Sequence, residues 1–407
     1  MAKTYDTYKD SGIKWLGTIP ANWRIEKGKH VLSVLSKPVL QDDDVVTCFR
    51  DGEVVLRNER RTEGFTMSDK EIGYQHIDKG DIVIHGMDGF AGSIGISKST
   101  GKGSPVLVVC NPIKDNPNYL VYYLRILANT NVFLALSTGI RQRSCDLKWN
   151  KISVLPFPLP SLPEQRTITT YLDEKCGEID TLISLQEEMI SELQAYKQSV
   201  ITEAVTKGLN PNVPMKDSGV EWIGMIPEGW NKCRLKYLCT IQTGNKDTQD
   251  AETDGKYQFF VRSPIIERSN SWTFEGEGIL MAGDGAGAGR VFHHTFGKYA
   301  VHQRVYRLAN FKNIITNYLF RYISSLFCKV MDMGSAQSTV PSVRLPMLSN
   351  FEVCLPPLSE QQAIASYLDE KTSQIDSLIA LKQEKITELK DYKKSIIYEY
   401  VTGKKKV

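Results

Sequence analysis

The chain has 407 residues, with 50 Lys and Arg against 47 Asp and Glu and a formal net charge of +3. This length suggests two or three domains, and a hydrophobic fraction of 41% excludes wholesale disorder. No apolar run approaches the roughly 18 residues that cross a bilayer, and no signal-peptide core is present. Eight scattered cysteines without a C-x-x-C pair favour reduced thiols in the cytoplasm over a disulfide framework or a zinc module.

The first segment, residues 1–160, is predicted to be a globular α/β domain. It opens with the motif Lys-Asp-Ser-Gly-Ile-Lys-Trp-Leu-Gly-Thr-Ile-Pro at 9–20. Short apolar runs at 81–84 and 106–109, bounded by turn residues, predict strands, and the apolar stretch at 119–124 predicts a helix. A proline-rich exit then leads to the next segment.

Residues 161–210 are predicted to form one long helix. Ser161 and Glu164 have the spacing of a capping box, and Gly208 and Pro211 end the helix. Apolar residues recur every seven positions in two rows, which is coiled-coil periodicity over about five heptads, or a rod of roughly 65 Å. The residues predicted to pack from this helix are Leu172, Ile179, Leu182, Leu193 and Tyr196.

Both the opening motif and the helix recur in the second half of the chain. The motif returns at 216–227, and 25 of the 45 residues at 162–206 are identical in 358–402. A repeat of this kind predicts a duplicated architecture. The predicted segments are a domain at 1–160, a helical spacer at 161–210, a second domain at 211–357 and a second spacer at 358–407. The packing residues of the second spacer are Leu368, Ile375, Leu378, Leu389 and Tyr392.

Each predicted helix has one apolar seam, so its natural partner is the other copy. If the two helices pair antiparallel, a pseudo-twofold axis relates the halves, and the N- and C-termini lie close together. The predicted fold class is therefore two related α/β domains separated by two long antiparallel coiled-coil helices.

A search for catalytic motifs finds none with the required spacing. The Asn/Asp-Pro-Pro-aromatic motif of amino methyltransferases is absent, and Gly101-Lys102 lacks the upstream glycine of an ATP-binding loop. The glycine-rich run at 283–289 does not match G-x-G-x-x-G, so a strand-to-strand loop is the better interpretation. The Asp-Glu-Lys triplets at 173–175 and 369–371 fall on predicted solvated helix faces. We expect no catalytic residue, metal ion or cofactor in this chain.

The near-neutral net charge neither requires nor excludes a nucleic-acid partner, but the two globular domains are the mildly basic parts of the chain. Residues 10–160 hold 19 Lys and Arg against 16 acids, residues 217–357 hold 15 against 13, and residues 161–210 hold 4 against 9. The first long helix would therefore repel phosphate. Arg can read guanine and Gln adenine, and such residues cluster near loops. A surface salt bridge explains any one of them well, but not the clusters as sets. The candidate DNA-binding residues are Arg141, Gln142, Arg143, Arg290, Gln303, Arg304, Gln337 and Arg344.

The two helices open with Leu-Pro-Glu-Gln-Arg (162–166) and Leu-Ser-Glu-Gln-Gln (358–362), and both continue with Tyr-Leu-Asp-Glu-Lys. Together with the paired Asp-Ser-Gly-x-x-Trp-x-Gly-x-Ile-Pro openings, this arrangement resembles the specificity (S) subunit of Type I restriction–modification systems. The resemblance covers essentially the whole chain. It implies that each variable segment is a target recognition domain that reads one half of a split double-stranded DNA sequence, at a spacing set by the helices.

The resemblance also implies partners. Two methyltransferase (M) subunits would dock on the helices and carry S-adenosylmethionine, and two restriction (R) subunits would bring ATP with Mg²⁺. The chain itself would be non-catalytic.

Two other classes of function stay open on the sequence alone. A self-contained methyltransferase or nuclease is disfavoured by the missing motifs, and S-adenosylmethionine binding by the purified chain would revive it. A coiled-coil scaffold without a DNA function explains the helices, but it does not explain two large, related globular domains.

Overall fold

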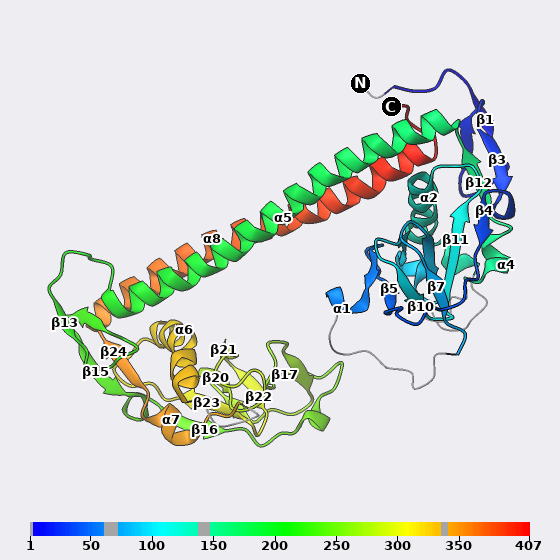
Figure 1. Cartoon of the computed structure of the whole chain (residues 1–407). Helices are drawn as coiled ribbons and strands as arrows, with labels where there is room; N and C mark the ends of the chain where they lie inside the picture. Colours follow the sequence, from blue (N-terminus) through cyan, green and yellow to red (C-terminus); the bar gives the residue numbers. More distant parts are fainter. Residues whose placement is uncertain (1–2, 61–71, 137–146, 335–340) are drawn as a thin grey trace. The chain divides into compact units, whose positions relative to one another are not determined.

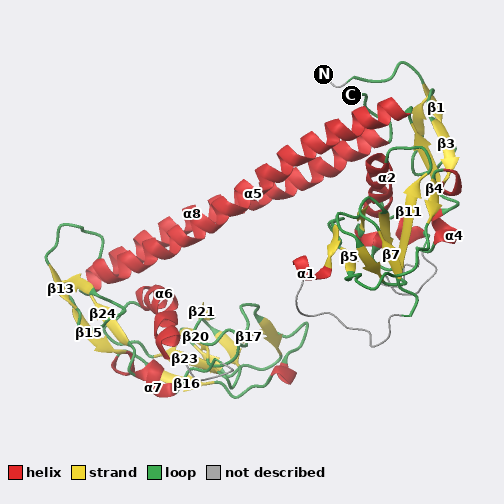
Figure 2. Ribbon diagram, viewed as in Figure 1, coloured by secondary structure: helices red, strands yellow, loops and turns green. Residues whose placement is uncertain are grey.

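The computed structural model describes residues 3–60, 72–136, 147–334 and 341–407 (Figures 1 and 2). The chain divides into two compact units: unit 1 is Met1–Gln186 with Glu384–Val407, and unit 2 is Glu187–Gln383. Each unit contains one globular domain, the start of one long helix and the end of the other. This division crosses both long helices, so the four-segment division stays a prediction.

Unit 1 is built from short antiparallel strands and one substantial domain helix. Its four-stranded sheet has the order β4-β11-β8-β9, and smaller pairs are β1-β2, β3-β12, β5-β6 and β7-β10. The strands are β1 (Tyr8–Asp10), β2 (Thr18–Pro20), β3 (Arg24–Lys27), β4 (Leu32–Val34), β5 (Val46–Cys48), β6 (Val54–Leu56), β7 (Gln75–Ile77), β8 (Ile82–His85), β9 (Ile94–Ile96), β10 (Gly101–Gly103), β11 (Leu107–Pro112) and β12 (Pro156–Leu159). The helices are α1 (Arg57–Arg60), α2 (Pro117–Asn129), α3 (Val132–Ala135), α4 (Trp149–Ile152) and the start of α5 (Leu162–Lys207).

Unit 2 repeats this plan and adds a second sheet. Its first sheet has the order β16-β23-β20-β21, its second the order β18-β17-β22-β19, and the smaller pairs are β13-β14 and β15-β24. The strands are β13 (Met215–Asp217), β14 (Met225–Pro227), β15 (Asn231–Arg234), β16 (Thr240–Thr243), β17 (Tyr257–Phe260), β18 (Glu267–Ser269), β19 (Phe274–Glu275), β20 (Gly278–Ala282), β21 (Phe292–Thr295), β22 (Lys298–Val301), β23 (Val305–Ala309) and β24 (Glu352–Leu355). The helices are α6 (Thr316–Gly334), α7 (Leu345–Ser349) and the start of α8 (Leu358–Val401).

The domain helix is stabilised by a local cap in unit 1 and by core packing in unit 2. In unit 1 the side chain of Asn116 accepts a hydrogen bond from the Tyr119 amide, and Pro117 occupies the first turn of α2, where its missing amide costs nothing. In unit 2 one face of α6, with Tyr318 and Tyr322, packs into the core with the sheet residues Ile279 and Leu308. The strands and helices predicted from the apolar runs are confirmed.

A buried glutamine joins each domain to its long helix. Gln165 on α5 accepts a hydrogen bond from the Asn116 amide (2.8 Å) and donates to the Pro160 carbonyl (3.1 Å) and to Asp115 (2.8 Å). Gln361 on α8 repeats the first two bonds, with the Ile315 amide (2.8 Å) and the Pro356 carbonyl (2.9 Å). Both side chains are fully buried, so each domain is fixed to the start of a helix by hydrogen bonds that water cannot replace.

A buried tyrosine joins each domain to the end of the other helix. The Tyr119 hydroxyl lies 2.9 Å from the Val401 carbonyl in the last turn of α8. In unit 2 the Tyr318 hydroxyl lies 3.1 Å from the Val205 carbonyl of α5. The last carbonyls of a helix have no partner within it, so the tyrosines satisfy groups that would otherwise be buried without a hydrogen bond.

The two long helices run antiparallel within each unit. In unit 1, Tyr171 contacts Tyr400, and Asp180 accepts a bond from Lys393 at 2.7 Å. In unit 2, Lys197 donates to Asp376 at 2.6 Å. Residue numbers rise on one helix as they fall on the other. The fold class predicted from the sequence is confirmed.

The structure corrects one of the two predicted packing rows. Leu172, Ile179, Leu368 and Ile375 are buried, and Leu193 and Leu389 are half-buried, as expected for the first row. In contrast, Leu182, Tyr196, Leu378 and Tyr392 are 46% to 58% exposed and do not form the seam within this chain. The second row of the seam consists of Cys176, Ile183, Ile190 and Lys197 on α5, with Thr372, Ile379, Ile386 and Lys393 on α8.

A pair of lysines, Lys197 and Lys393, explains why the sequence pattern favoured the wrong row. Both rows satisfy the alternating three- and four-residue spacing of a coiled coil, and the row with Lys197 and Lys393 is the less apolar one. Each lysine is half-buried in the seam and reaches an aspartate of the opposite helix, Asp376 or Asp180. A lysine can bury its aliphatic stem while its ammonium group stays at the surface, which makes this row compatible with the seam.

The two chain ends meet in unit 1, as predicted. Lys3 forms an antiparallel bridge with Lys406, whose amide donates to the Lys3 carbonyl at 2.8 Å. The Lys404 ammonium donates to the Leu16 carbonyl at 2.9 Å, beside strand β2. In Figure 1 the N and C labels lie next to each other. The C-terminal lysines Lys404 and Lys406 thus help to close this unit.

Candidate DNA interface

Three segments of unit 2 form one cluster of loops, which we call the arginine loop cluster. Its members are the β20–β21 connection at 283–290, the β22–β23 turn at 302–304 and residues 341–344. The Gly283 amide donates to the Arg304 carbonyl (2.8 Å), the Val343 amide donates to the Gly283 carbonyl (2.8 Å), and the Gly285 amide donates to the Pro341 carbonyl (3.0 Å). Strands β20 and β21 are antiparallel, so the predicted strand-to-strand loop is confirmed.

Three predicted arginines lie on this cluster and are exposed. Arg304 lies 3.7 Å from Asp284, which also accepts a bond from Arg262 at 3.1 Å. Arg290 pairs with Asp332 at 2.6 Å, and Arg344 lies at the start of α7. Exposed ion pairs contribute little to stability, so these guanidinium groups can exchange an aspartate for another acceptor at little cost. The cluster therefore presents several hydrogen-bond donors suited to phosphates and base edges.

The β22–β23 turn is held by a neutral histidine. His302 is buried, and its Nδ1 accepts a bond from the Arg304 amide at 2.9 Å, which places the ring proton on Nε2. Burial, and next the nearby Arg262, lower the pKa of His302 below its ordinary value. Gln303 from the same turn donates to Asp247 at 2.8 Å. The turn thus has a fixed backbone and exposed side chains.

Unit 1 has a counterpart of this cluster, which the sequence did not reveal. Arg50 donates to Asp88 on the β8–β9 connection at 2.9 Å, as Arg262 does to Asp284 in unit 2. The Leu147 amide donates to the Gly86 carbonyl at 3.0 Å, as the Val343 amide does to Gly283. Arg50 and Arg262 are therefore additional candidates. The available signal was an arginine shortly after an apolar strand in each half, together with an Asp-Gly turn downstream.

Four of the predicted DNA-binding residues lie outside the described residues. They are Arg141, Gln142, Arg143 and Gln337. The described neighbours Leu147 and Pro341 are hydrogen-bonded to the glycine loops of their own domains, at Gly86 and Gly285. The four residues stay predictions from the sequence.

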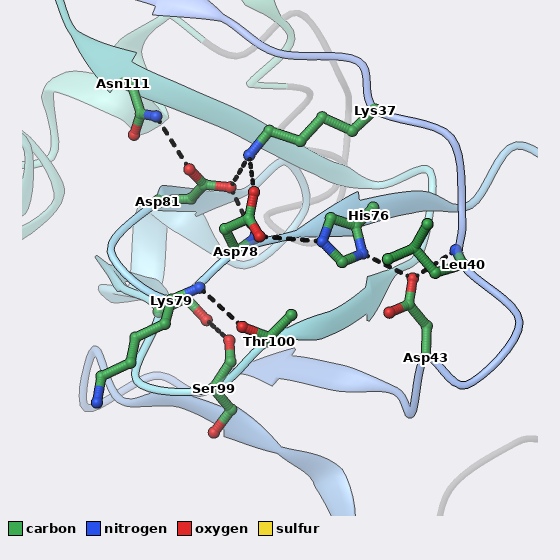
Figure 3. A network of polar contacts seen from close by, with 11 residues as sticks. Lys37, Leu40, Asp43, His76, Asp78, Lys79, Asp81, Ser99, Thr100 and Asn111 are labelled. Carbon is green, nitrogen blue, oxygen red and sulfur yellow. Dashed lines mark hydrogen bonds and ion pairs between the residues drawn. The ribbon is translucent and has the colours of Figure 1, made fainter.

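Figure 3 shows a separate network of polar contacts in unit 1, in which His76, Asp43 and Asp81 are buried. His76 contacts Asp43 (2.8 Å) through Nδ1 and Asp78 (3.1 Å) through Nε2, so both ring nitrogens face carboxylates. Lys37 donates to Asp78 and to the buried Asp81, each at 2.7 Å. Because its carboxylates and cations are partnered within the network, we assign it a role in holding β7, β8 and the 37–43 segment together.

The pKa values in this network are shifted in opposite directions. The hydrogen bond to Asp43 raises the pKa of His76, although burial opposes it. Burial alone would raise the pKa of Asp43, but the bonds from His76 and the Leu40 amide lower it overall. Hydrogen bonds from Lys37 and then His76 lower the pKa of the exposed Asp78. The network is therefore most favourable with His76 protonated and both aspartates ionised.

These shifts predict a pH dependence of the stability of unit 1. A raised histidine pKa contributes stability that is complete below the unfolded value of 6.5 and is lost as pH rises through the folded value. We expect the free energy of unfolding to fall as the pH rises above 6.5, because the pKa of His76 is raised in the folded state. We expect His76→Gln to flatten this slope in urea denaturation series. His302→Gln in unit 2 is the control, because a lowered pKa acts in the opposite direction. An unchanged slope in the His76 variant would contradict the assignment.

Within the part of the chain that the structure describes, no group of three or more His, Cys, Asp or Glu side chains could hold a metal ion. Among the same residues, no helix is both long and apolar enough to cross a membrane.

Comparison with known proteins shows which proteins this chain is similar to. A family model for the Type I restriction modification DNA specificity domain matches residues 227–391. The putative MjaX specificity subunit of Methanocaldococcus jannaschii is 25% identical across 98% of both chains. The EcoDI specificity subunit of Escherichia coli is 29% identical over 180 residues, which are 44% of this chain and 39% of that protein. The second half of the chain thus matches the DNA specificity domain of Type I restriction–modification systems, and the chain as a whole is similar to their specificity subunits.

Solved structures of the family share its fold. A chain from a structure of Type I restriction–modification complex assembly has a TM-score of 0.71 at 17% identity and covers 94% of this chain and 98% of its own length. The HsdS subunit of Thermoanaerobacter tengcongensis has a TM-score of 0.51 at 17% identity, covering 97% and 99%. At this identity the likeness concerns the fold. The family model lies in the second half, and the internal repeat extends the same architecture to the first.

Proposed function

We propose that this chain is the sequence-reading subunit of a Type I restriction–modification complex, with each globular domain contacting one half of a split double-stranded DNA site. The observation that carries this proposal is the repeated construction of the two units. Each unit has a glycine loop with an arginine–aspartate pair, on a domain fixed to the ends of both long helices by a buried glutamine and a buried tyrosine. A bipartite reader needs two such sites.

The proposed division of labour follows the four predicted segments. Residues 1–160 and 211–357 act as target recognition domains, and residues 161–210 and 358–407 act as spacers that set the distance between the half-sites. In this proposal the chain has no catalytic residue. S-adenosylmethionine binds to the methyltransferase subunits, and ATP with Mg²⁺ binds to the restriction subunits. The complex acts in the cytoplasm, where the DNA lies.

The exposed apolar row on the long helices supports a role in docking. It consists of Leu182, Leu185, Met189 and Tyr196 on α5 with Leu378, Leu381 and Tyr392 on α8, which are 41% to 60% exposed. Regularly spaced apolar residues that stay exposed on a helix suit packing against further helices. We propose that two methyltransferase subunits cover this row, one for each half of the repeat, and that two restriction subunits join through them.

This docking role predicts a loss of assembly. Replacing Leu182, Tyr196, Leu378 and Tyr392 together by serine should weaken binding of the methyltransferase subunit more than about a hundredfold, because each large apolar side chain contributes roughly 1.5–3 kcal/mol when covered. Co-purification and analytical ultracentrifugation measure the change. The fold should survive, since the four residues lie outside the seam. Ile265→Ser, at another exposed apolar position, is the matched control. Intact assembly of the quadruple variant would argue against this surface.

The arginine loop cluster predicts an effect on DNA affinity. Arg304→Ala should weaken binding of the assembled complex to its own site by about 1–3 kcal/mol, since an arginine reading a guanine contributes this much discrimination. Fluorescence anisotropy with the cognate duplex measures the change. Arg234→Ala, an exposed arginine on β15 outside the cluster, should change affinity less than about twofold. If Arg304→Ala and Arg234→Ala weakened DNA binding equally, the assignment of Arg304 as a base-reading residue would be wrong.

Genome-wide mapping of adenine methylation in host cells with and without this gene tests the function itself. A split motif that vanishes on deletion would establish the reading role and reveal both half-sites. Persistence of every motif beside an expressed methyltransferase partner would favour the scaffold alternative.

A further inference from the structure

Each unit has a site beside a buried tryptophan, Trp23 in unit 1 and Trp230 in unit 2. This site is filled by a side chain in unit 1 and open in unit 2. In unit 2 a cleft of about 470 Å³ opens next to Trp230, with walls that include Pro214, Pro227, Pro357 and Glu360. The tryptophan Nε1 donates to Glu360 at 3.1 Å. The cleft therefore has apolar walls and two carboxylates, of which Glu360 is bonded to the tryptophan and Glu228 is the other.

In unit 1 the matching position is filled by a side chain of the chain itself. Tyr5 is buried against Trp23, with the two rings edge to face and 6.0 Å apart. Its hydroxyl donates to Glu164 at 2.7 Å, and Glu164 also accepts a bond from Trp23 Nε1 at 3.3 Å. Burial and the bond to Glu164 raise the pKa of Tyr5, so the phenol stays a hydrogen-bond donor. Lys406 lies 5.7 Å from the centre of the ring.

The repeat identifies the two positions as equivalent. The motif at 9–20 returns at 216–227, which aligns Trp23 with Trp230, and the helix repeat aligns Glu164 with Glu360. By the same alignment Tyr5 corresponds to Asn212. Asn212 is exposed, and its amide is bound to Asn210 at 3.0 Å, so it leaves the cleft open. Among the described residues, Glu360 accepts one side-chain hydrogen bond, from Trp230, where Glu164 accepts two.

We propose that the cleft beside Trp230 is a receptor for a tyrosine side chain carried on an extended segment of a partner protein. The occupied site in unit 1 defines the chemistry: a phenol ring edge to face with the indole, and a hydroxyl that donates to the glutamate. In unit 2 the open cleft adds proline walls. This docking site is distinct from the DNA interface and does not rest on the proposed function.

The probe is a fluorescein-labelled peptide with the sequence of residues 3–9, carrying Tyr8→Ser so that Tyr5 is its one tyrosine. With the full chain we expect saturable binding at one site, measured by fluorescence anisotropy. The same peptide with Tyr5→Phe should bind roughly tenfold more weakly, because the bond to a charged acceptor is lost. Glu360→Gln in the protein should weaken the tyrosine peptide to a similar degree. Glu164→Gln, in the unit whose site is filled, should leave peptide binding unchanged.

A second variant tests the equivalence of the two sites. Tyr5→Ala empties the site in unit 1, and the number of bound peptides should rise from one to two. The proposal is overturned if no saturable binding occurs, if the phenylalanine peptide binds equally well, or if Glu360→Gln has no effect. If N-acetyl-tyrosinamide bound as tightly as the peptide, the cleft would be a site for free phenols. The proposal that it receives a segment of a partner protein would then be overturned. If Tyr5→Ala fails to fold, the Glu360 and Glu164 variants decide alone.

Discussion

Inserting one heptad into each long helix is expected to abolish adenine methylation at the parental DNA motif. Seven helical residues add about 10.5 Å, which corresponds to about three base pairs of DNA. If the helices set the spacing, the enlarged subunit either reads a site with a longer spacer or reads none. Methylation mapping of cells that carry only the variant measures both outcomes.

The structure indicates where the insertions belong. Placed between Gln186 and Glu187 and between Gln383 and Glu384, they fall at the boundary of the two units. The cross-helix bonds of Lys197 with Asp376 and of Lys393 with Asp180 each lie within one unit, so both survive, and a whole heptad preserves the seam. An insertion in α5 alone is the control for misfolding, since it leaves the two helices unequal. Methylation at the unchanged parental spacing by the double insertion would refute the spacer role.

Gln165→Ala is expected to lower the free energy of unfolding by about 3 kcal/mol, because it leaves the Asn116 amide and the Pro160 carbonyl buried without a partner. It also removes a bond to the buried Asp115. Gln361→Ala removes two bonds to backbone groups only, so we expect it to lower the free energy of unfolding by a smaller amount, about 2 kcal/mol. Urea denaturation gives the total change, and hydrogen exchange at Asn116 and Ile315 assigns it to the unit concerned.

The neighbouring Gln362 provides the matched control. It is exposed on the same helix as Gln361, so Gln362→Ala should change stability by less than about 0.5 kcal/mol. Similar small effects at Gln165 and Gln362 would mean that the domain is held to the helix by apolar packing alone.

The large elements of the fold were predictable because they repeat. The 25 identities between 162–206 and 358–402 indicated two equivalent helices, and one apolar seam on each indicated an antiparallel pair. The second packing row could not be chosen from periodicity, since rows offset by three or four residues both fit a heptad. The choice depends on the ion pairs of Lys197 and Lys393 across the helices, which no pattern within one helix reveals.

The candidate DNA interface was predictable only in part. Arg290, Arg304 and Arg344 were found as arginines near loops, and backbone hydrogen bonds bring their loops into one cluster. Arg50 and Arg262 were missed because each follows a strand that is remote in sequence from its aspartate partner, Asp88 or Asp284. The open cleft beside Trp230 could not be predicted from the sequence either. It is open because Tyr5 fills the equivalent site beside Trp23 and the second half has no such tyrosine.

The exchange of helix ends between the units has a genetic consequence. Tyr119 binds the carbonyl of Val401, and Tyr318 binds that of Val205, an equivalent residue of the other copy. A product of half the length, made by one ancestral gene, would therefore satisfy all of these contacts by pairing with a second molecule of itself. Tandem duplication and fusion would keep the contacts unchanged and join one pair of ends between Thr206 and Lys216. After such a fusion, the two halves could accumulate different substitutions in their loops.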